Sequence, residues 1–141
     1  EHIHPIPGHL GPEAAALAYE AELPNASEPF DLVLLGIGED GHIASLFPGN
    51  SALLETTRAV APVRHAPKPP PKRVTLTLPV LRRARHTWIV ASGTEKKTIL
   101  QRVFSPLTTE PPLPAQLLLS SHGTVTWMLD RAAAPTAKDS P

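Results

Sequence analysis

Apolar residues recur along the chain with two spacings, and these separate predicted strands from predicted helices. The run at 31–35 carries apolar residues on both faces, which is typical of a central, parallel strand inside a sheet. At 74–78, apolar residues alternate with threonines, a pattern that favours another strand. The alanine-rich segment at 13–23 follows Pro12 and predicts a helix, because proline suits the first helical position and alanine the interior.

Strands alternate with helices along the rest of the chain. This alternation indicates an α/β fold, with a mostly parallel sheet flanked by helices, in one domain at 1–134. We expect 135–141 to be a disordered tail. The other predicted elements are strands at 58–63, 87–91, 117–119 and 124–128, the last two paired across a turn at 120–123, and helices at 44–47 (a single turn), 79–84, 95–104 and 129–134.

Charge is unevenly distributed, although the formal net charge is zero. Residues 1–57 hold nine acids and no Lys or Arg, whereas residues 58–102 hold eleven Lys or Arg and one acid. The basic part suggests an anionic partner, such as a small phosphorylated molecule. We do not expect nucleic acid as a partner, because aromatic residues do not alternate with the basic positions. Solvated surface charge is the open alternative for most of these side chains.

Composition excludes several classes of protein. The chain has no cysteine, which rules out disulfides, thiolate metal sites and a cysteine nucleophile. No apolar run approaches the roughly 18 residues that span a bilayer, and no basic-then-apolar leader opens the sequence. We therefore expect a cytoplasmic protein without a membrane partner.

The glycines at 36–41, in the pattern Gly-x-Gly-x-x-Gly, fit the fingerprint of a dinucleotide-binding turn and follow a predicted strand. Two features argue against that function. Glu39 and Asp40 would repel a pyrophosphate at the point where the backbone should hold it. No acid lies about 20 residues downstream to bind a ribose.

Asp40 and His42 give a sharper signal in the same turn. A carboxylate two residues from an imidazole can hold one ring nitrogen and leave the other to take a proton from water. The neighbouring glycines allow backbone N–H groups to approach a ligand oxygen closely. On these residues alone, a histidine that only stabilises the turn is an equally good interpretation.

Two other chemistries receive little support. His2, His4 and His9 are close in sequence, but they lack a convergent acid and predict a metal site only weakly. The chain contains no Gly-x-Ser-x-Gly elbow, so a serine hydrolase is not expected.

Five blocks of the sequence resemble, in the same order, the family of 6-phosphogluconolactonases. The continuation Ser-Leu-Phe-Pro at 45–48 differs from the Asn-Glu-Pro that follows the same core in glucosamine-6-phosphate deaminases, and it favours the lactonases. The resemblance implies the sugar-phosphate isomerase-like (Rossmann-like) α/β fold that both groups share. The blocks are 31–49, 67–81, 91–97, 113–115 and 126–134, and the opening at 2–8 is also similar to the middle region of the family.

The resemblance also implies an activity, the hydrolysis of 6-phospho-D-glucono-1,5-lactone to 6-phospho-D-gluconate in the oxidative pentose phosphate pathway. This reaction requires neither a metal nor an organic cofactor. We assign His42 as the general base, with Asp40 as its orienting group or as a ligand of sugar hydroxyls. Backbone N–H groups between Gly38 and Gly41 are candidate donors to the developing oxyanion.

Two cations are candidates to bind the phosphate of this small phosphorylated sugar lactone. Arg73 stands at the start of a predicted strand, where a guanidinium can hold a phosphate through two hydrogen bonds. Lys96 stands in the first turn of a predicted helix, where its charge adds to a helix N-terminus that already favours anions. Solvated surface positions are the alternative for both side chains.

Members of the family usually carry a further N-terminal region, with a Ser-Gly-Gly loop and an Asp-Glu-Arg segment. Neither tripeptide occurs in this sequence. We therefore expect the chain to be a C-terminal part whose sheet lacks its first strands, with an exposed sheet edge that permits self-association. A truncated, noncatalytic fragment that binds sugar phosphates is the alternative function.

Overall fold

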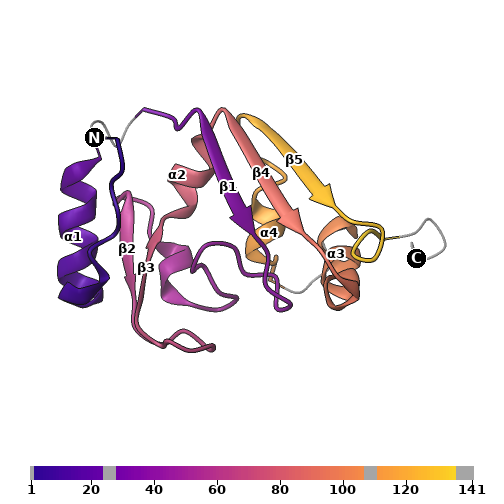
Figure 1. Ribbon diagram of the computed structural model, residues 1–141, viewed down its shortest axis with the longest axis horizontal. Helices are drawn as coiled ribbons and strands as arrows, with labels where there is room; N and C mark the ends of the chain where they lie inside the picture. Colours follow the sequence, from indigo (N-terminus) through magenta and orange to yellow (C-terminus); the bar gives the residue numbers. More distant parts are fainter. Residues whose placement is uncertain (1, 24–27, 107–110, 136–141) are drawn as a thin grey trace.

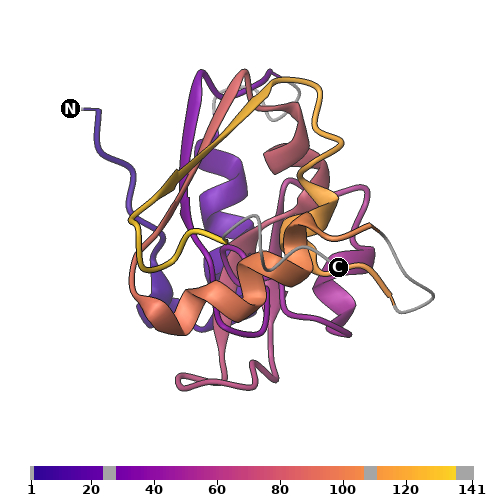
Figure 2. The ribbon, with the colours of Figure 1, turned by 90° about the vertical axis from the view of Figure 1, so that its right-hand side faces the viewer.

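A computed structural model describes residues 2–23, 28–106 and 111–135 of the chain. A parallel sheet of three strands, in the order β1-β4-β5, forms one layer of the fold, and helices pack on one of its two faces (Figures 1 and 2). The predicted α/β class with a parallel sheet is therefore confirmed. The strands of this sheet are β1 (Leu32–Gly36), β4 (His86–Ala91) and β5 (Thr124–Leu129).

A second, smaller layer consists of helix α1 packed on the antiparallel strands β2 and β3 (Figure 1). Ala16 of α1 is fully buried in a cluster with Val60 and Val80, because its methyl group lets the helix approach the strands closely. The elements outside the parallel sheet are η1 (Gly8–Leu10), α1 (Pro12–Glu22), η2 (Ser51–Leu54), β2 (Val60–Val63), β3 (Arg73–Leu76), α2 (Leu78–Arg83), η3 (Thr94–Lys96), α3 (Lys97–Phe104) and α4 (Pro114–Leu117).

Most predicted elements are confirmed. The helix at 13–23 is α1, and the strands at 31–35 and 87–91 are β1 and β4. The strands at 58–63 and 74–78 also form, but they pair with each other rather than with the parallel sheet. The helices at 79–84 and 95–104 correspond to α2 and to η3 followed by α3.

The strand predicted at 124–128 is confirmed as β5, but the other predictions near the C-terminus are wrong. Residues 117–119 do not pair with 124–128; the leucines continue from helix α4, with Leu118 fully buried, and β5 pairs in parallel with β4. A short apolar run does not distinguish a strand from a buried helical turn. The helix predicted at 129–134 is instead the end of β5 followed by a turn, which the Asp130 carboxylate closes by accepting from the Ala133 N–H at 2.8 Å. The predicted tail lies, from residue 136 onward, outside the described residues.

One face of the parallel sheet is uncovered within the described residues. Its helix-covered face buries Ile89 and Ala91, whereas Leu34, Trp88 and Met128 on the other face are 63%, 39% and 46% exposed. In the described part of the chain, β1 pairs with β4 alone, so the prediction that β1 is a central strand is wrong there. No helix among the described residues has both the length and the apolar character needed to cross a membrane.

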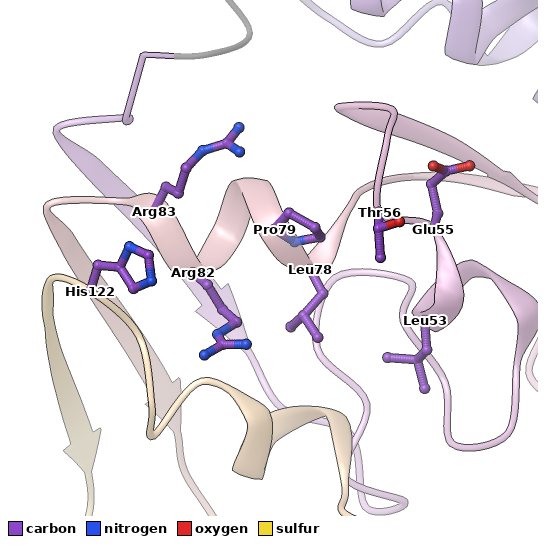
Figure 3. Close-up of a pocket in the computed structure, with 8 residues that line it drawn as sticks. All are labelled: Leu53, Glu55, Thr56, Leu78, Pro79, Arg82, Arg83 and His122. Carbon is purple, nitrogen blue, oxygen red and sulfur yellow. The ribbon is translucent and has the colours of Figure 1, made fainter.

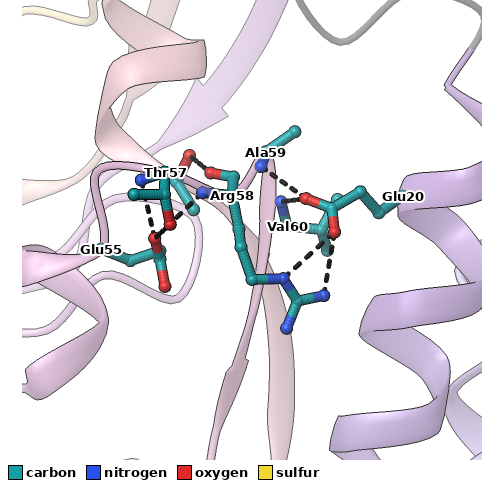
Figure 4. A network of polar contacts seen from close by, with 7 residues as sticks. Glu20, Glu55, Thr57, Arg58, Ala59 and Val60 are labelled. Carbon is teal, nitrogen blue, oxygen red and sulfur yellow. Dashed lines mark hydrogen bonds and ion pairs between the residues drawn. The ribbon is translucent and has the colours of Figure 1, made fainter.

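An ion pair with four hydrogen bonds joins α1 to the start of β2 (Figure 4). The Glu20 carboxylate accepts from the N–H groups of Ala59 and Val60 at 2.5 and 3.1 Å, and from Nε and Nη2 of Arg58 at 3.1 and 3.0 Å. Burial alone would raise the pKa of Glu20, but the N–H groups and the guanidinium outweigh it and hold this pKa below its usual value.

A second carboxylate closes the turn that leads into β2. Oε1 of Glu55 accepts from the Thr57 N–H at 2.8 Å, from the Thr57 hydroxyl at 2.7 Å and from the Arg58 N–H at 2.9 Å (Figure 4). The N–H of Arg58 is the main cause that lowers the pKa of Glu55 to about 2. Arg58 is therefore held at its backbone by one acid and at its side chain by another.

Replacing Glu20 by alanine removes the acceptor of all four bonds. We expect the free energy of unfolding to fall by roughly 2–3 kcal/mol, because hydrogen bonds to charged groups contribute about 1.5–3 kcal/mol. Urea unfolding followed by circular dichroism measures the loss. Glu22→Ala is the matched control, since Glu22 on the same helix makes only an exposed contact with His4 among the described residues and should change stability by less than about 0.5 kcal/mol. Equal losses in the two variants would contradict this assignment.

The lowered pKa values of Glu20 and Glu55 predict acid sensitivity. Both carboxyls bind protons less readily in the folded chain than in the unfolded chain, so stability is full above about pH 4.5 and declines as the pH falls toward their folded values. Urea unfolding at a series of pH values should show this decline, and Glu20→Gln should make it shallower. A free energy of unfolding that is constant down to about pH 3 would contradict the prediction.

Candidate active site

The segment after β1 folds into a tight turn at the carboxyl end of the sheet. The Gly41 N–H donates to the Gly38 carbonyl at 2.9 Å, and the Gly38 N–H donates to the His42 carbonyl at 2.9 Å. Gly41 has a φ of 82°, and a Cβ there would lie 3.1 Å from the Leu113 side chain. This turn therefore requires glycine at position 41.

Asp40 and His42 meet on this turn. Oδ1 of Asp40 lies 2.5 Å from Nδ1 of His42 and also accepts from the His42 N–H at 3.3 Å. The two side chains are 29% and 17% exposed. Because an ionised carboxylate can only accept, Nδ1 carries the proton, and in the neutral imidazole Nε2 then keeps a lone pair. The contact predicted between these side chains is present, while the role of His42 as a base stays a prediction.

The environment of Asp40 keeps it ionised. Burial is the largest influence and raises the pKa of Asp40, but hydrogen bonds from the His42 ring and backbone, together with the charge of the ring, outweigh it. The pKa of Asp40 is therefore below its usual value. A carboxylate that is charged at neutral pH can stabilise an imidazolium that forms beside it.

Gly38 provides the space in which the pair sits. A Cβ built on Gly38 would lie 2.0 Å from Nδ1 of His42 and 2.6 Å from Oδ1 of Asp40. The imidazole thus packs directly against the backbone of Gly38. The first glycine of the turn at 38–41 is needed for this close approach, which the fingerprint pattern did not reveal.

The backbone donors of the turn are only partly available. The N–H groups of Gly38 and Gly41 both donate hydrogen bonds within the turn, so neither is available to a ligand. The N–H of Glu39, between them, forms no backbone hydrogen bond within the described residues. The two glycines stay predicted substrate-binding residues through close backbone approach, with Glu39 as the candidate donor.

Arg73 begins β3 as predicted and lies near the turn. Its guanidinium carbon is 5.2 Å from the centre of the Phe47 ring, and that ring is 4.3 Å from the His42 ring, centre to centre. The guanidinium donates through Nε to the Pro70 carbonyl at 3.0 Å and through Nη2 to two further carbonyls of the same loop. Among its nitrogens, Nη1 alone forms no hydrogen bond to the described residues. Arg73 therefore has one nitrogen available for a phosphate, whereas the sequence predicted two hydrogen bonds to it.

Lys96 lies at the same carboxyl end of the sheet, in η3, which follows β4. Its Nζ lies 4.0 Å from Oε1 of Glu39, and its side chain is 21% exposed. Glu39 is itself 60% exposed, so an anionic ligand can replace it as the partner of Lys96. The structure therefore brings Lys96 beside the Asp40 turn, as the predicted site requires.

Sequence reasoning missed two residues that shape the site. Phe47 is fully buried and its ring packs against the His42 ring at a tilt of 35°, while Leu113 packs over Gly41 just before α4. The Ala115 N–H also donates to the Gly41 carbonyl at 3.1 Å, which fixes α4 to the turn. Phe47 belongs to the Ser-Leu-Phe-Pro run at 45–48 that favours the lactonases, but the local pattern indicates only the end of a helical turn there and not a ring contact with His42.

A cavity among the described residues lies away from this turn. It has a volume of about 300 Å³ between η2 and α2 (Figure 3). α2 and His122 precede the amino ends of β4 and β5, whereas Asp40 and His42 follow the carboxyl end of β1, so this cavity does not hold the predicted chemistry. The lining residues are Leu53, Glu55, Thr56, Leu78, Pro79, Arg82, Arg83 and His122.

No group of three or more His, Cys, Asp and Glu side chains that could hold a metal ion occurs in the described part of the chain. Of the three N-terminal histidines, His4 contacts Glu22 through Nδ1 at 3.4 Å, and its side chain is 57% exposed.

Replacing Gly38 by alanine should separate His42 from Asp40. The new Cβ would overlap the imidazole, and the side chain can swing outward more readily than the backbone can shift. The ¹⁵N chemical shifts of the His42 ring, measured at mildly alkaline pH, report whether Nδ1 still carries the proton. Gly36→Ala is the matched control, since a Cβ there meets nothing within 4 Å. An unchanged His42 ring signature in folded Gly38→Ala would contradict the geometry.

Comparison of the sequence with known proteins gives a consistent result. The family model for glucosamine-6-phosphate isomerases/6-phosphogluconolactonase matches residues 1–127. The 6-phosphogluconolactonase of Bos taurus is 52% identical over 105 residues, which cover 74% of this chain and 40% of that protein. The 6-phosphogluconolactonase of Mycobacterium tuberculosis is 41% identical over 144 residues, which cover 94% of this chain and 57% of that protein.

Solved structures agree with the sequence relatives. The crystal structure of devB protein has a TM-score of 0.81 at 32% identity, over 94% of this chain and 57% of that one. The 6-phosphogluconolactonase from Trypanosoma cruzi has a TM-score of 0.72 at 38% identity, over 86% of this chain and 50% of that one. This chain spans about half the length of the relatives that it matches. It belongs to the glucosamine-6-phosphate isomerase/6-phosphogluconolactonase family.

Proposed function

We propose that this chain carries the hydrolytic part of a cytoplasmic lactonase, which converts 6-phospho-D-glucono-1,5-lactone to 6-phospho-D-gluconate in the oxidative pentose phosphate pathway. The observation that carries the proposal is the Asp40–His42 pair, which leaves Nε2 with a lone pair at the carboxyl end of a parallel strand. The names of the relatives, 6-phosphogluconolactonases at up to 52% identity, support the substrate.

The proposed reaction is general-base hydrolysis of a cyclic ester. Nε2 of His42 takes a proton from a water molecule, and the water oxygen adds to the lactone carbonyl carbon. The tetrahedral intermediate then breaks the bond to the ring oxygen, which takes the proton back from the imidazolium as it leaves. Asp40, 2.5 Å from Nδ1, stabilises the imidazolium between these two steps. The product is one open-chain sugar acid, which carries the new carboxyl group and the new hydroxyl, and the proposed reaction uses no cofactor.

The groups around the pair provide the remaining requirements. The Glu39 N–H is the candidate donor to the oxyanion, with Gly38 and Gly41 allowing the substrate to approach the backbone. Lys96 is the candidate partner of the phosphate, which would displace Glu39 from its 4.0 Å contact. Arg73 adds positive charge near the same turn, together with Nη1, which has no hydrogen-bond partner within the described residues.

The alternative is a noncatalytic fragment that binds sugar phosphates. One observation favours it: the match covers 40% and 57% of the length of two curated relatives, so a large part of each of those proteins lies outside the match. Under this alternative, Lys96 still binds a phosphate, but His42 does not activate a water molecule. Binding of 6-phosphogluconate, measured by calorimetry and found without any acceleration of hydrolysis, would favour this alternative.

Acid release from freshly generated 6-phosphogluconolactone tests the catalytic proposal. We expect the purified chain to exceed the spontaneous rate, and His42→Ala to lower the catalysed part by roughly 10²–10⁴-fold, the usual contribution of a general base. His9→Ala is the matched control, because His9 is exposed in η1 and outside the turn, and it should leave the rate unchanged. A folded chain whose rate equals the spontaneous rate would contradict catalysis by this chain.

The predicted self-association through a sheet edge stays a proposal, which is supported by the unpaired edge of β1 within the described residues and by the uncovered sheet face beside it. Leu34 on β1 is 63% exposed, and apolar side chains of β4 and β5 lie beside it on the same face. We expect the mass measured by light scattering to rise with concentration, and Leu34→Lys to keep the chain monomeric. Leu54→Lys is the matched control, since Leu54 is 81% exposed but lies in η2, and it should still self-associate. A monomer mass at every concentration would exclude self-association.

A further inference from the structure

Phe47 reaches the candidate base through a second tight turn. The Leu46 N–H donates to the Ile43 carbonyl at 2.9 Å, and Ala44 adopts a φ of 48°, an uncommon conformation for a residue with a side chain. This turn replaces the helical turn predicted at 44–47. It directs the Phe47 ring back to the His42 ring, with the two ring centres 4.3 Å apart and the planes inclined by 35°.

The Phe47 ring is fixed by its surroundings. Its side chain is fully buried, and the Ser45 N–H beside it donates to Oγ1 of Thr75 on β3 at 3.2 Å. Arg73, on the same strand, places its guanidinium carbon 5.2 Å from the centre of the ring. A guanidinium over an aromatic ring attracts it electrostatically. β3 therefore holds the Phe47 turn at both its backbone and its ring.

The guanidinium of Arg73 is held in turn by its own loop. Nε donates to the Pro70 carbonyl at 3.0 Å, and Nη2 donates to the carbonyls of Lys68 and Pro69 at 2.9 Å each. Because three carbonyls accept hydrogen bonds from two of its nitrogens, the guanidinium group has little freedom to rotate. The loop at 68–70 thus fixes Arg73, and Arg73 fixes the ring that faces His42.

A single hydrogen bond does not define the plane of an imidazole. The bond from Nδ1 to Asp40 fixes one atom of the ring, and the backbone of Gly38 limits its approach. Rotation about the remaining side-chain torsion is restricted only by a surface that lies against the ring. Such torsions, which end in a flat ring, have broad minima of their own. The Phe47 ring is the aromatic surface in contact with His42 among the described residues.

We propose that Phe47 is a positioning residue for His42, which it holds with Nδ1 on Asp40 and Nε2 directed to the substrate, and that Arg73 and its loop hold Phe47 in place. The importance of this role for catalysis rests on the proposed function. The contacts among His42, Phe47 and Arg73 do not depend on that function. Arg73 accordingly acts on the base through Phe47, whether or not Nη1 also meets a phosphate.

The decisive measurement is the ¹⁵N signature of the His42 ring at mildly alkaline pH, with no substrate present. In the unaltered chain we expect one tautomer, protonated on Nδ1. Phe47→Leu replaces the flat surface by a branched one of similar apolar character, and we expect a mixture of tautomers with broadened signals. Phe104→Leu is the control for the same substitution outside the turn, because Phe104 on α3 makes an edge-to-face contact with Trp127, 4.9 Å between ring centres.

Arg73→Lys is the second variant, and it decides the question if Phe47→Leu does not fold. It keeps the charge but loses the bonds to the loop carbonyls, and we expect the same broadening to a smaller extent. A His42 signature that is unchanged in folded Phe47→Leu, or in Arg73→Lys where that variant decides, overturns the proposal.

Kinetics provide the second readout where the chain hydrolyses the lactone. Because a small misplacement of a catalytic group can cost up to about 100-fold in rate, we expect kcat of Phe47→Leu to fall roughly 10- to 100-fold with KM nearly unchanged. An unchanged kcat overturns the proposal. The two proposals fail separately: a chain without lactonase activity, whose His42 signature still depends on Phe47, loses the proposed function but keeps the positioning role.

Discussion

The parallel pairing of β1 with β4 is the constraint on which the candidate site depends. Because the two strands run in the same direction, the segments that follow them, 37–42 and 92–96, leave the sheet at the same edge. The 4.0 Å contact between Lys96 and Glu39 is the direct result of this pairing. An antiparallel partner would have placed the lysine at the opposite end of the sheet from the histidine.

Within that frame, the chemistry depends on residues that have no reactive groups. Gly38 leaves room for the imidazole, Gly41 allows the left-handed conformation of the turn, and Phe47 supports the ring. Asp40 keeps a lowered pKa in spite of partial burial because the ring and backbone of His42 both donate to it. Asp40 and Glu39 would repel a pyrophosphate in this turn. Each has its own partner instead, His42 for Asp40 and Lys96 for Glu39.

Local patterns predicted the elements that are decided locally. The alanine-rich helix α1, the apolar strands β1 and β4, and the contact of Asp40 with His42 all follow from spacing and residue type. The failures depend on tertiary structure: the leucines at 117–119 were assigned to a hairpin, because nothing local shows that Leu118 enters the core and that β5 pairs with β4. The contacts of Arg73 with its own loop, and of Phe47 with His42, are equally invisible to periodicity.

The central claim is that the turn after β1, and not the cavity between η2 and α2, receives the sugar phosphate. Titration of 6-phosphogluconate into the ¹⁵N-labelled chain, followed through its backbone amide signals, tests this claim most directly. We predict that the largest shifts occur at 38–42 and at Lys96. Shifts confined to the residues around the cavity, such as Arg82 and His122, or no shifts at any concentration of the ligand, would contradict the claim.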